Sequence, residues 1–495
     1  MGILNDDMVI ISEAEKEGDH KVIAVNCPDR IGIGCDICRI IFLFGLTIVK
    51  GDTITDGKWC YMVFWVYGEA NTNWNLLKNR LSDICPSHSS IYEIKNYIHD
   101  EHKPPVPPQV FQLKFWCSCD GNGLLHDVTE ALHQLELIIK RVKISTTPDG
   151  KKMHLVFVTD TRKELHTTER EQQTKVHLKT VLGDKFIDCE IELAGSEIMA
   201  SLHGSLNLPS GITDDIFNLE SVKGYQSSTL ASYPVSIAMD NKFSLSHSLF
   251  QISCWDHKGL LYDILRTLKD YNIQVSYGKL RGKPKGNFDV ELFITQADGK
   301  KLMDPNKKIA LCCRLKMELL YPLRVAVGSR GPDTELFVAN PVELSGSGRP
   351  LVFYDITHAC KSLNISIFSV EIGRHIVRDR EWEVYRILLD ESDGKFSVPR
   401  KKIEESVRKT LMDWEHLRST PGRRLIAEPH ETDPCLASNG DFQRQQRLNG
   451  VPGDSDSITV MTWFVTVLPA TLAVIGNDQK AYHLLRRQPS HGGSS

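Results

Sequence analysis

Short apolar runs alternate with amphipathic stretches through most of the chain. In two places, a stripe of apolar residues at helical spacing follows such a run after a short loop. The first stripe consists of Ile33, Ile37, Ile40, Ile41 and Phe44, and the second of Leu261, Ile264, Leu265 and Leu268. An apolar face that recurs every three to four residues predicts a helix packed on a core.

Two β-rich runs follow each predicted helix, with a turn sequence between them. After the first helix they cover residues 47–55 and 59–67, and the turn contains Asp56-Gly57, which suits a hairpin. A second helix is expected at 74–84, 166–182 and 305–317, and a last short strand at 91–97, 187–193 and 322–327. The order βαββαβ predicts an α+β fold of ferredoxin-like modules, each an antiparallel sheet covered by two helices.

A loop motif repeats at the start of the first helix of each module. Each Asp-x-x-Gly copy is followed by another Asp four residues after the glycine. The intact copies contain Asp29 and Gly32, Asp120 and Gly123, and Asp256 and Gly259. A fourth copy is degraded, because Gly348 and Leu351 occupy the Asp and Gly positions while Asp355 remains. The spacing predicts four modules arranged as two pairs, with an extra segment of about 45 residues between the pairs.

The repeats also set the expected domain boundaries. We expect modules at 20–100, 109–194, 247–328 and 333–416, a tail at 1–19, a linker at 195–246 and a tail at 417–495. The proline-rich run 104–108 predicts a stiff spacer. The C-terminal tail is expected to be disordered. Its uncharged run 458–475 reaches the lower length limit of a membrane span, but it contains Pro469 and several threonines, so no membrane anchor is expected.

Charge and cysteine content narrow the class of protein further. The net charge of -4 offers no electrostatic basis for binding nucleic acid or an anionic membrane. The 13 cysteines are an odd number, scattered along the chain, and the first residues show no signal-peptide pattern. We therefore expect free thiols in a reducing compartment, namely the cytoplasm, with the nucleus left open.

Motifs for catalysis or metal binding are incomplete. His99-Asp100 and His126-Asp127 lack companion histidines at ligand spacing, and Cys35-x-x-Cys38 lacks a second ligand pair. The Gly32-x-Gly34 sequence lacks the third glycine of a dinucleotide-binding loop. Signatures of kinases and serine hydrolases are absent from the sequence. We predict no enzymatic activity, no cofactor and no metal.

The start of the first helices resembles that of a known plant family. The repeated D-x-x-G-L-L-x-D pattern is similar to that of plant ACT-domain-repeat proteins, which carry four ACT modules and no catalytic domain. The resemblance covers about residues 20–415. It implies that free amino acids bind at module interfaces and that the protein regulates a partner protein in nitrogen metabolism or signalling. Self-association through the ACT sheets is left open.

The chemistry of the loops fits an amino-acid ligand independently of this resemblance. Unpaired N–H groups at a helix N-terminus can bind an α-carboxylate, and a nearby Asp can hold the α-ammonium. A loop glycine lets the backbone approach the ligand closely. The candidate amino-acid-binding residues are Asp29, Gly32, Asp120, Gly123, Asp256 and Gly259. The alternative is that each Asp only caps its helix and each Gly only forms the turn.

Two other classes of function compete with an amino-acid sensor. The stronger is a protein–protein interaction scaffold that has lost ligand binding. The weaker is an RNA-binding protein, because RNA-binding modules share the βαββαβ order and residues 58–64 are similar to their aromatic third strand. That strand lacks the expected glycine and its aromatic residues do not recur in the other modules, so nucleic acid is not an expected partner.

Overall fold

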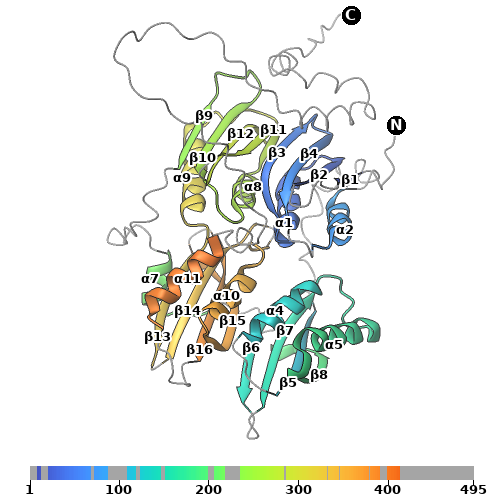
Figure 1. Cartoon of the computed structure of the whole chain (residues 1–495). Helices are drawn as coiled ribbons and strands as arrows, with labels where there is room; N and C mark the ends of the chain where they lie inside the picture. Colours follow the sequence, from blue (N-terminus) through green and yellow to red (C-terminus); the bar gives the residue numbers. More distant parts are fainter. Residues whose placement is uncertain are drawn as a thin grey trace, which may run out of the picture. The chain divides into compact units, whose positions relative to one another are not determined.

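A computed structural model of the chain describes the parts that carry the repeats (Figure 1). The described residues are 8–12, 20–68, 72–86, 109–118, 123–146, 151–198, 206–217, 235–283, 286–331, 333–344, 346–377, 380–390 and 398–412. The expected strand at 91–97, the spacer at 104–108, Asp120 and the tail at 417–495 lie outside these residues. The predictions made for them are therefore not tested.

Four α+β modules follow one another in the chain, and we number them 1 to 4. Module 1 contains β1 (Val9–Ser12), β2 (Lys21–Pro28), α1 (Ile33–Leu43), β3 (Thr47–Thr55), β4 (Trp59–Tyr67) and α2 (Trp74–Ile84). Module 2 contains β5 (Val110–Cys117), α4 (Leu124–Gln134), β6 (Leu137–Thr146), β7 (Lys152–Asp160), α5 (Thr168–Leu182) and β8 (Phe186–Leu193).

Modules 3 and 4 repeat the order of helices and strands of module 1. Module 3 contains β9 (Ser236–Asp240), β10 (Ser248–Trp255), α8 (Leu260–Asp270), β11 (Ile273–Gly282), β12 (Asn287–Gln296) and α9 (Pro305–Leu320). Module 4 contains β13 (Arg324–Arg330), β14 (Asp333–Pro341), α10 (Val352–Ser362), β15 (Ser366–Val377), β16 (Arg380–Asp390) and α11 (Arg400–Met412). The strands expected at 47–55 and 59–67 and the helix at 74–84 have the predicted bounds.

The edge strand of three modules comes from an unexpected part of the sequence. In module 1 the segment expected to be a tail supplies β1, and in module 3 the segment expected to be a linker supplies β9. The strand expected to close module 3 at 322–327 is instead β13, which pairs with β14 of module 4. Among the residues that the structure describes, module 2 alone closes with a strand after its second helix, β8. The unpaired edge beside the first strand can accept an antiparallel strand from either end of the module. The strand predicted at 322–327 therefore exists, but it belongs to module 4 and not to module 3.

The modules form two pairs through continuous sheets. One eight-stranded sheet has the order β1-β2-β4-β3-β11-β12-β10-β9 and joins modules 1 and 3. The other has the order β13-β14-β16-β15-β6-β7-β5-β8 and joins modules 2 and 4. Strands β3 and β11 lie side by side in Figure 1, with Gly278 opposite Thr53. The prediction of two pairs is confirmed, but the partners alternate along the chain and are not sequence neighbours.

Each pair has one shared apolar core. In pair 1/3, Ile37 of α1 and Ile264 of α8 belong to the same cluster of buried side chains. In pair 2/4, Val128 of α4 and Ile356 of α10 share a second cluster. The first helices of the paired modules also contact each other, α1 with α8 and α4 with α10. This contact places the loop at the start of each first helix beside the partner module.

The segment between modules 2 and 3 is more than a linker. Besides β9 it contains α7 (Ser210–Phe217), which contributes Ile216 to an apolar cluster with Phe337 and Trp382 of module 4. These residues lie apart from the core that the helices α10 and α11 cover. The segment therefore shields apolar surface of module 4 that would otherwise face water.

Candidate functional site

The three intact loops start their helices in the same way. Gly32, Gly123 and Gly259 are the N-cap residues of α1, α4 and α8, with φ angles of 82°, 93° and 80°. This left-handed backbone costs a residue with a Cβ about 1–2 kcal/mol, which explains why glycine occupies the position. Since the N-cap residue is a glycine in each case, it has no side chain that could bond the first N–H groups of its helix. The N-cap position belongs to the glycine, and Asp29 and Asp256 lie three residues before it.

Asp29 lies at the interface of the two paired modules. Its Oδ2 accepts a hydrogen bond of 2.6 Å from Thr55 Oγ1 of β3 and one of 2.9 Å from Gln274 Nε2 of β11 in module 3. Its backbone N–H donates to the carbonyl of Lys58. The loop carboxylate predicted as a ligand group thus already links module 1 to module 3.

The loop of module 3 borders a small cavity that module 1 completes. Asp256, Gly259 and Phe288 line it from module 3, and Phe42 and Ile48 line it from α1 and β3 of module 1. The cavity volume is about 30 Å³. That volume holds about two water molecules, so an amino acid enters only if a wall moves.

The loop of module 2 borders a matching cavity of about 20 Å³. Gly123 and His126 line it from module 2, and Thr357, Lys361 and Ile367 line it from module 4. Burial, and after it the nearby His358, lower the pKa of His126 to about 4. His126 is therefore neutral at physiological pH, with Nδ1 3.1 Å from Thr357 Oγ1.

A side chain of the partner module covers each loop glycine. A Cβ added at Gly32 would lie 2.7 Å from Cδ of Lys269, and one at Gly123 would lie 2.6 Å from Cγ of Lys361. At Gly259 the nearest atom is Cε1 of Phe42, at 2.8 Å. The three covering residues share one place in the repeat, ten residues after the loop position of their own module.

The Asp in the first helical turn is part of the same contact. Lys269 Nζ lies 2.7 Å from Asp36 Oδ1, and Lys361 Nζ lies 2.7 Å from Asp127 Oδ1. Both ion pairs cross from one module of a pair to the other. Asp36 and Asp127 are therefore residues of the interface between paired modules.

The degraded loop of module 4 contacts modules of the other pair. Leu351 takes the left-handed backbone of the missing glycine, with φ 64°. The loop reaches pair 1/3: Arg39 of α1 donates to the carbonyl of Gly348, and the Arg349 guanidinium bonds the Lys258 carbonyl in the loop of module 3. The absence of Asp and Gly here agrees with a loop that binds other modules.

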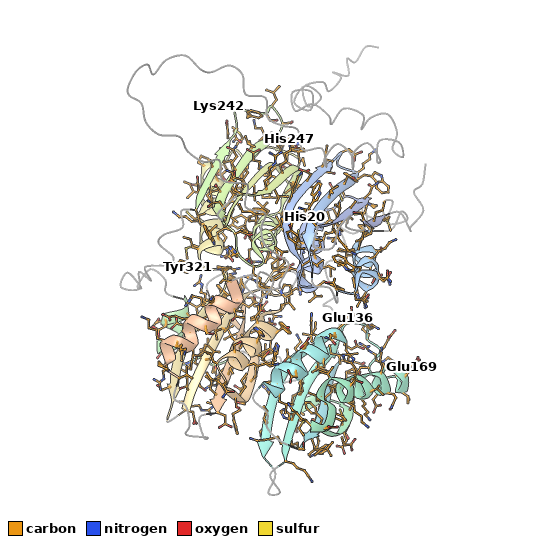
Figure 2. The ribbon with its side chains drawn as sticks, viewed as in Figure 1. His20, Glu136, Glu169, Lys242, His247 and Tyr321 are labelled. Carbon is orange, nitrogen blue, oxygen red and sulfur yellow. The ribbon has the colours of Figure 1, made fainter. Side chains whose placement is uncertain are left out.

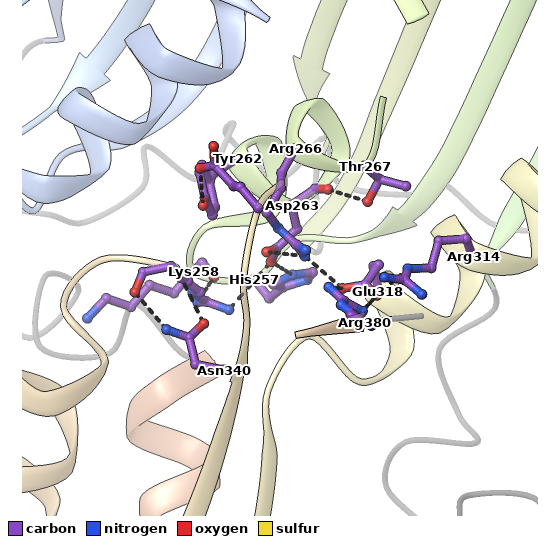
Figure 3. A network of polar contacts seen from close by, with 12 residues as sticks. His257, Lys258, Tyr262, Asp263, Arg266, Thr267, Arg314, Glu318, Asn340 and Arg380 are labelled. Carbon is purple, nitrogen blue, oxygen red and sulfur yellow. Dashed lines mark hydrogen bonds and ion pairs between the residues drawn. The ribbon is translucent and has the colours of Figure 1, made fainter. Parts of the chain in front are cut away.

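A buried network of charged side chains connects modules 3 and 4 (Figure 3). Glu318 of α9 pairs with Arg266 of α8 at 2.7 Å and with Arg380 of module 4. Lys258 pairs with Asp355 of α10 at 2.6 Å. These side chains are almost completely buried. Because a buried charge is costly unless it is paired, the network holds the two modules in one arrangement.

The network stabilises the ionised form of the Glu318 carboxyl. Burial alone would raise the pKa of its carboxyl, but the charges of Arg266 and Arg380 outweigh burial and lower the pKa to about 2. The sequence pattern did not predict this network. The one available signal was the presence of Lys258, Asp263 and Arg266 within or beside an apolar helix, where charged residues are normally excluded.

Glu136, labelled in Figure 2, connects modules 1 and 2. It follows α4 and pairs with Arg80 of α2 and with Arg162, the latter at 2.6 Å. Burial opposes its charge, but the two arginines lower the pKa of its carboxyl. His133 adds a second link, with Nε2 3.1 Å from the carbonyl of Leu43 in module 1.

One group of side chains in the described residues has metal-like spacing. Donor atoms of Cys35, Asp36 and Glu343 lie within 4.8 Å of one another. Lys269 Nζ, however, contacts both carboxylates, at 2.7 Å and 3.0 Å. Burial raises the pKa of the Cys35 thiol. A lysine ammonium beside the acids and a protonated thiol do not fit a cation, so we assign no metal here.

Among the described residues, all cysteines are free. Most are buried in the cores, where a thiol packs as a small apolar side chain. No helix in the described parts of the chain is long and apolar enough to cross a membrane.

Together, the paired βα modules with their loops at the shared interface define a protein of tandem ACT modules. Family models support this class: residues 11–86 match the N-terminal part of ACT domain-containing protein ACR10, residues 236–333 match an ACR9-like, ACT-like domain, and residues 334–413 match the C-terminal part of ACT domain-containing protein ACR9.

Curated relatives extend the match to whole proteins. The chain is 55% identical to ACT domain-containing protein ACR10 of Arabidopsis thaliana over 418 residues, which is 84% of this chain and 100% of the relative. It is 48% identical to ACR9 of the same plant over 421 residues, with the same coverage. The chain therefore belongs to the plant family of ACT-domain-repeat proteins, as the sequence predicted.

Solved structures add little to this assignment. An aspartate kinase from Synechocystis matches at 14% identity, over 84% of this chain and 56% of the kinase, with a TM-score of 0.15. At that score the comparison carries no argument.

Proposed function

We propose that the chain is a non-catalytic regulatory protein that binds a free amino acid at the loops between paired modules. It then signals amino-acid or nitrogen status to a partner protein, in the cytoplasm or the nucleus. The observation that supports this best is the position of Asp29. Its carboxylate bonds Thr55 of its own module and Gln274 of the partner module, so a ligand at this loop would contact both.

The loop geometry suits the two charged ends of an amino acid. The N-terminus of α1 or α8 carries partial positive charge and can take the α-carboxylate. Asp29 or Asp256 can hold the α-ammonium. Residues of the partner module, such as Ile48 and Phe42 beside the loop of module 3, then contact the ligand's side chain. The loop of module 2, with Asp120 and Gly123, is a third site of the same kind.

The small size of the cavities gives this binding a regulatory consequence. Since an amino acid enters only when side chains of the partner module move, binding changes how the two modules pack. The same change in packing can alter the affinity for a partner protein by a coupling free energy of about 1–3 kcal/mol.

Thermal unfolding of the full chain tests the proposal. Each of the twenty protein amino acids is added at the same millimolar concentration to the wild type, Asp29→Ala, Asp256→Ala and Asp120→Ala. An amino acid present at about 100 times its Kd should stabilise the wild type by about 2.7 kcal/mol. The stabilisation should disappear in one Asp variant and persist in the control Asp298→Asn, which changes an exposed turn.

The second candidate function is a protein–protein interaction scaffold without a ligand. The observation that favours it is the covering of Gly32 and Gly123 by lysine side chains of the partner module. An unchanged unfolding temperature with all twenty amino acids would support the scaffold. Capture of the same protein partner by the wild type and by Asp29→Ala would then identify its function.

A further inference from the structure

Two of the three intact loops are closed by the same chemical group. At the loop of module 1, the Lys269 stem lies against Gly32, with Cγ, Cδ and Cε all within 2.9 Å of the position of an added Cβ. Its Nζ is 2.7 Å from Asp36 and 3.0 Å from Glu343. A ligand that touched this loop glycine would have to occupy the space of that lysine.

Pair 2/4 repeats this arrangement with different residues. The Lys361 stem lies against Gly123, again with three carbons within 2.9 Å of an added Cβ, and its Nζ is 2.7 Å from Asp127. Lys269 and Lys361 occupy equivalent positions in modules 3 and 4. The corresponding residue of module 1 is Phe42, which covers Gly259 without an ion pair of its own. The lysine closure thus occurs twice, in two pairs with independent cores.

We propose that the side chains of Lys269 and Lys361 occupy the ligand-binding positions at the loops of modules 1 and 2. A free amino acid then binds there only by displacing the lysine. The proposal rests on the proposed function and adds its regulation. The lysine ammonium carries the same charge as the α-ammonium of an amino acid, and it is held by a carboxylate in the first helical turn after the loop, Asp36 or Asp127. The ligand and the lysine therefore compete for the space beside the loop glycine, and both need a carboxylate to hold their ammonium group.

The two closures differ in strength. Lys269 is 20% exposed, and its second acceptor Glu343 is held in turn by the Tyr262 hydroxyl at 2.6 Å. Lys361 is 41% exposed, and Asp127 is its acceptor. Burial opposes the charge of Lys269, but Asp36 and Glu343 raise the pKa of its ammonium. Because Glu343 belongs to module 4, the loop of module 1 should open only when its contact with module 4 loosens, and the loop of module 2 should open more easily.

Binding to opened variants tests the proposal. Calorimetric titration of the full chain with each of the twenty amino acids compares the wild type with Lys269→Ala and Lys361→Ala. If the lysine keeps a loop mostly closed, its removal raises the fraction of open sites, and the amino acid should bind roughly fivefold more tightly. Lys316→Ala, in an exposed position of α9, is the matched control and should bind as the wild type does. Adding Asp29→Ala to Lys269→Ala should abolish the gain at the loop of module 1.

Each outcome decides between the two proposals. Binding to Lys269→Ala or Lys361→Ala that is tighter than to the wild type, or that appears only in these variants, supports the lysine closure. Equal or weaker binding overturns the closure and leaves the amino-acid sensor standing. If no amino acid binds the wild type or either variant, both proposals fail. Lys269→Met and Lys361→Met, which keep most of the stem and lose the charge, serve where the alanine variants do not fold.

Discussion

At the scale of single residues, the start of the first helix keeps one backbone shape in all four modules. Gly32, Gly123 and Gly259 adopt a left-handed φ, and Leu351 adopts it as well. For leucine this conformation costs about 1–2 kcal/mol. The Leu351 side chain packs against a small cluster that contains Phe42 and Tyr262, and this burial offsets the cost. The module fold, and not the glycine itself, therefore dictates the turn.

Gly259→Ala separates backbone strain from crowding at this position. The new Cβ would lie 2.8 Å from Phe42 and 3.0 Å from Arg349, in addition to adopting φ 80°. Gly57→Ala is the matched control, since φ there is 85° and nothing lies within 4 Å. We expect Gly57→Ala to cost about 1 kcal/mol and Gly259→Ala distinctly more, as measured by urea unfolding. Equal costs would show that the loop has room for a side chain.

Glu318 should make the protein sensitive to acid. The pKa of its carboxyl is lowered from 4.5 to about 2 in the folded state, so its stabilising effect is complete above pH 4.5 and is lost as the pH falls towards 2. Glu318→Gln should destabilise the protein at neutral pH by about 3–5 kcal/mol, because Arg380 stays buried without its acid and Arg266 keeps only Asp263, at 3.3 Å. The variant should also show a shallower loss of stability between pH 4.5 and 2. Unfolding measured across this pH range checks both effects, and parallel curves for variant and wild type would contradict the assignment.

At the scale of elements, the edge strand of a module is not tied to one place in the chain. Strand β1 precedes the first helix of module 1, whereas β8 follows the second helix of module 2. Both pair antiparallel with the first core strand of their module. An exposed edge offers unpaired N–H and C=O groups to whichever segment lies near it. This explains why the repeat pattern did not predict β1 and β9 and assigned the strand at β13 to module 3 instead of module 4.

The N-terminal strand should stabilise module 1 measurably. Val9 of β1 is fully buried although it lies in the segment that the sequence assigned to a tail. Val9→Ala should lower the free energy of unfolding by about 2 kcal/mol, from the lost apolar burial and the space left behind. Ser12→Ala, at the exposed end of the same strand, is the control. An unchanged melting temperature for Val9→Ala would mean that β1 does not contribute to the fold.

At the scale of the whole molecule, ion pairs connect the two module pairs. Lys258 and Asp355 are both buried and join the loop of module 3 to the first helix of module 4. Lys258→Met leaves Asp355 without its partner and should cost about 3–5 kcal/mol. Adding Asp355→Asn should recover part of this loss, because the variant pair no longer buries a charge.

Calorimetry measures this coupling between the pairs. In Lys258→Met the unfolding of pairs 1/3 and 2/4 should separate into two transitions. Lys300→Met is the control, since it removes an exposed ion pair worth about 0–1 kcal/mol. A single unshifted transition in Lys258→Met would show that other contacts hold the pairs together.

The sequence predicted those features that local patterning controls. The apolar stripe from Ile33 to Phe44 and the Asp56-Gly57 turn determine a helix and a hairpin within a few residues, so β3, β4 and α2 have the predicted bounds. The Asp-x-x-Gly repeat was sufficient to recognise the ACT family and to locate the candidate loops. Such features depend on residues that are close together in the chain, so one sequence is enough to predict them.

The tertiary structure decided which modules meet and what covers the loops. Pairing of module 1 with 3 depends on contacts such as Asp29 with Gln274, which lie 245 residues apart. The closure of Gly32 by Lys269, and the burial of Lys258 and Glu318, depend on the same long-range packing. A sheet edge or a buried charge finds its partner through shape and charge in space, and no periodicity along the chain records that choice.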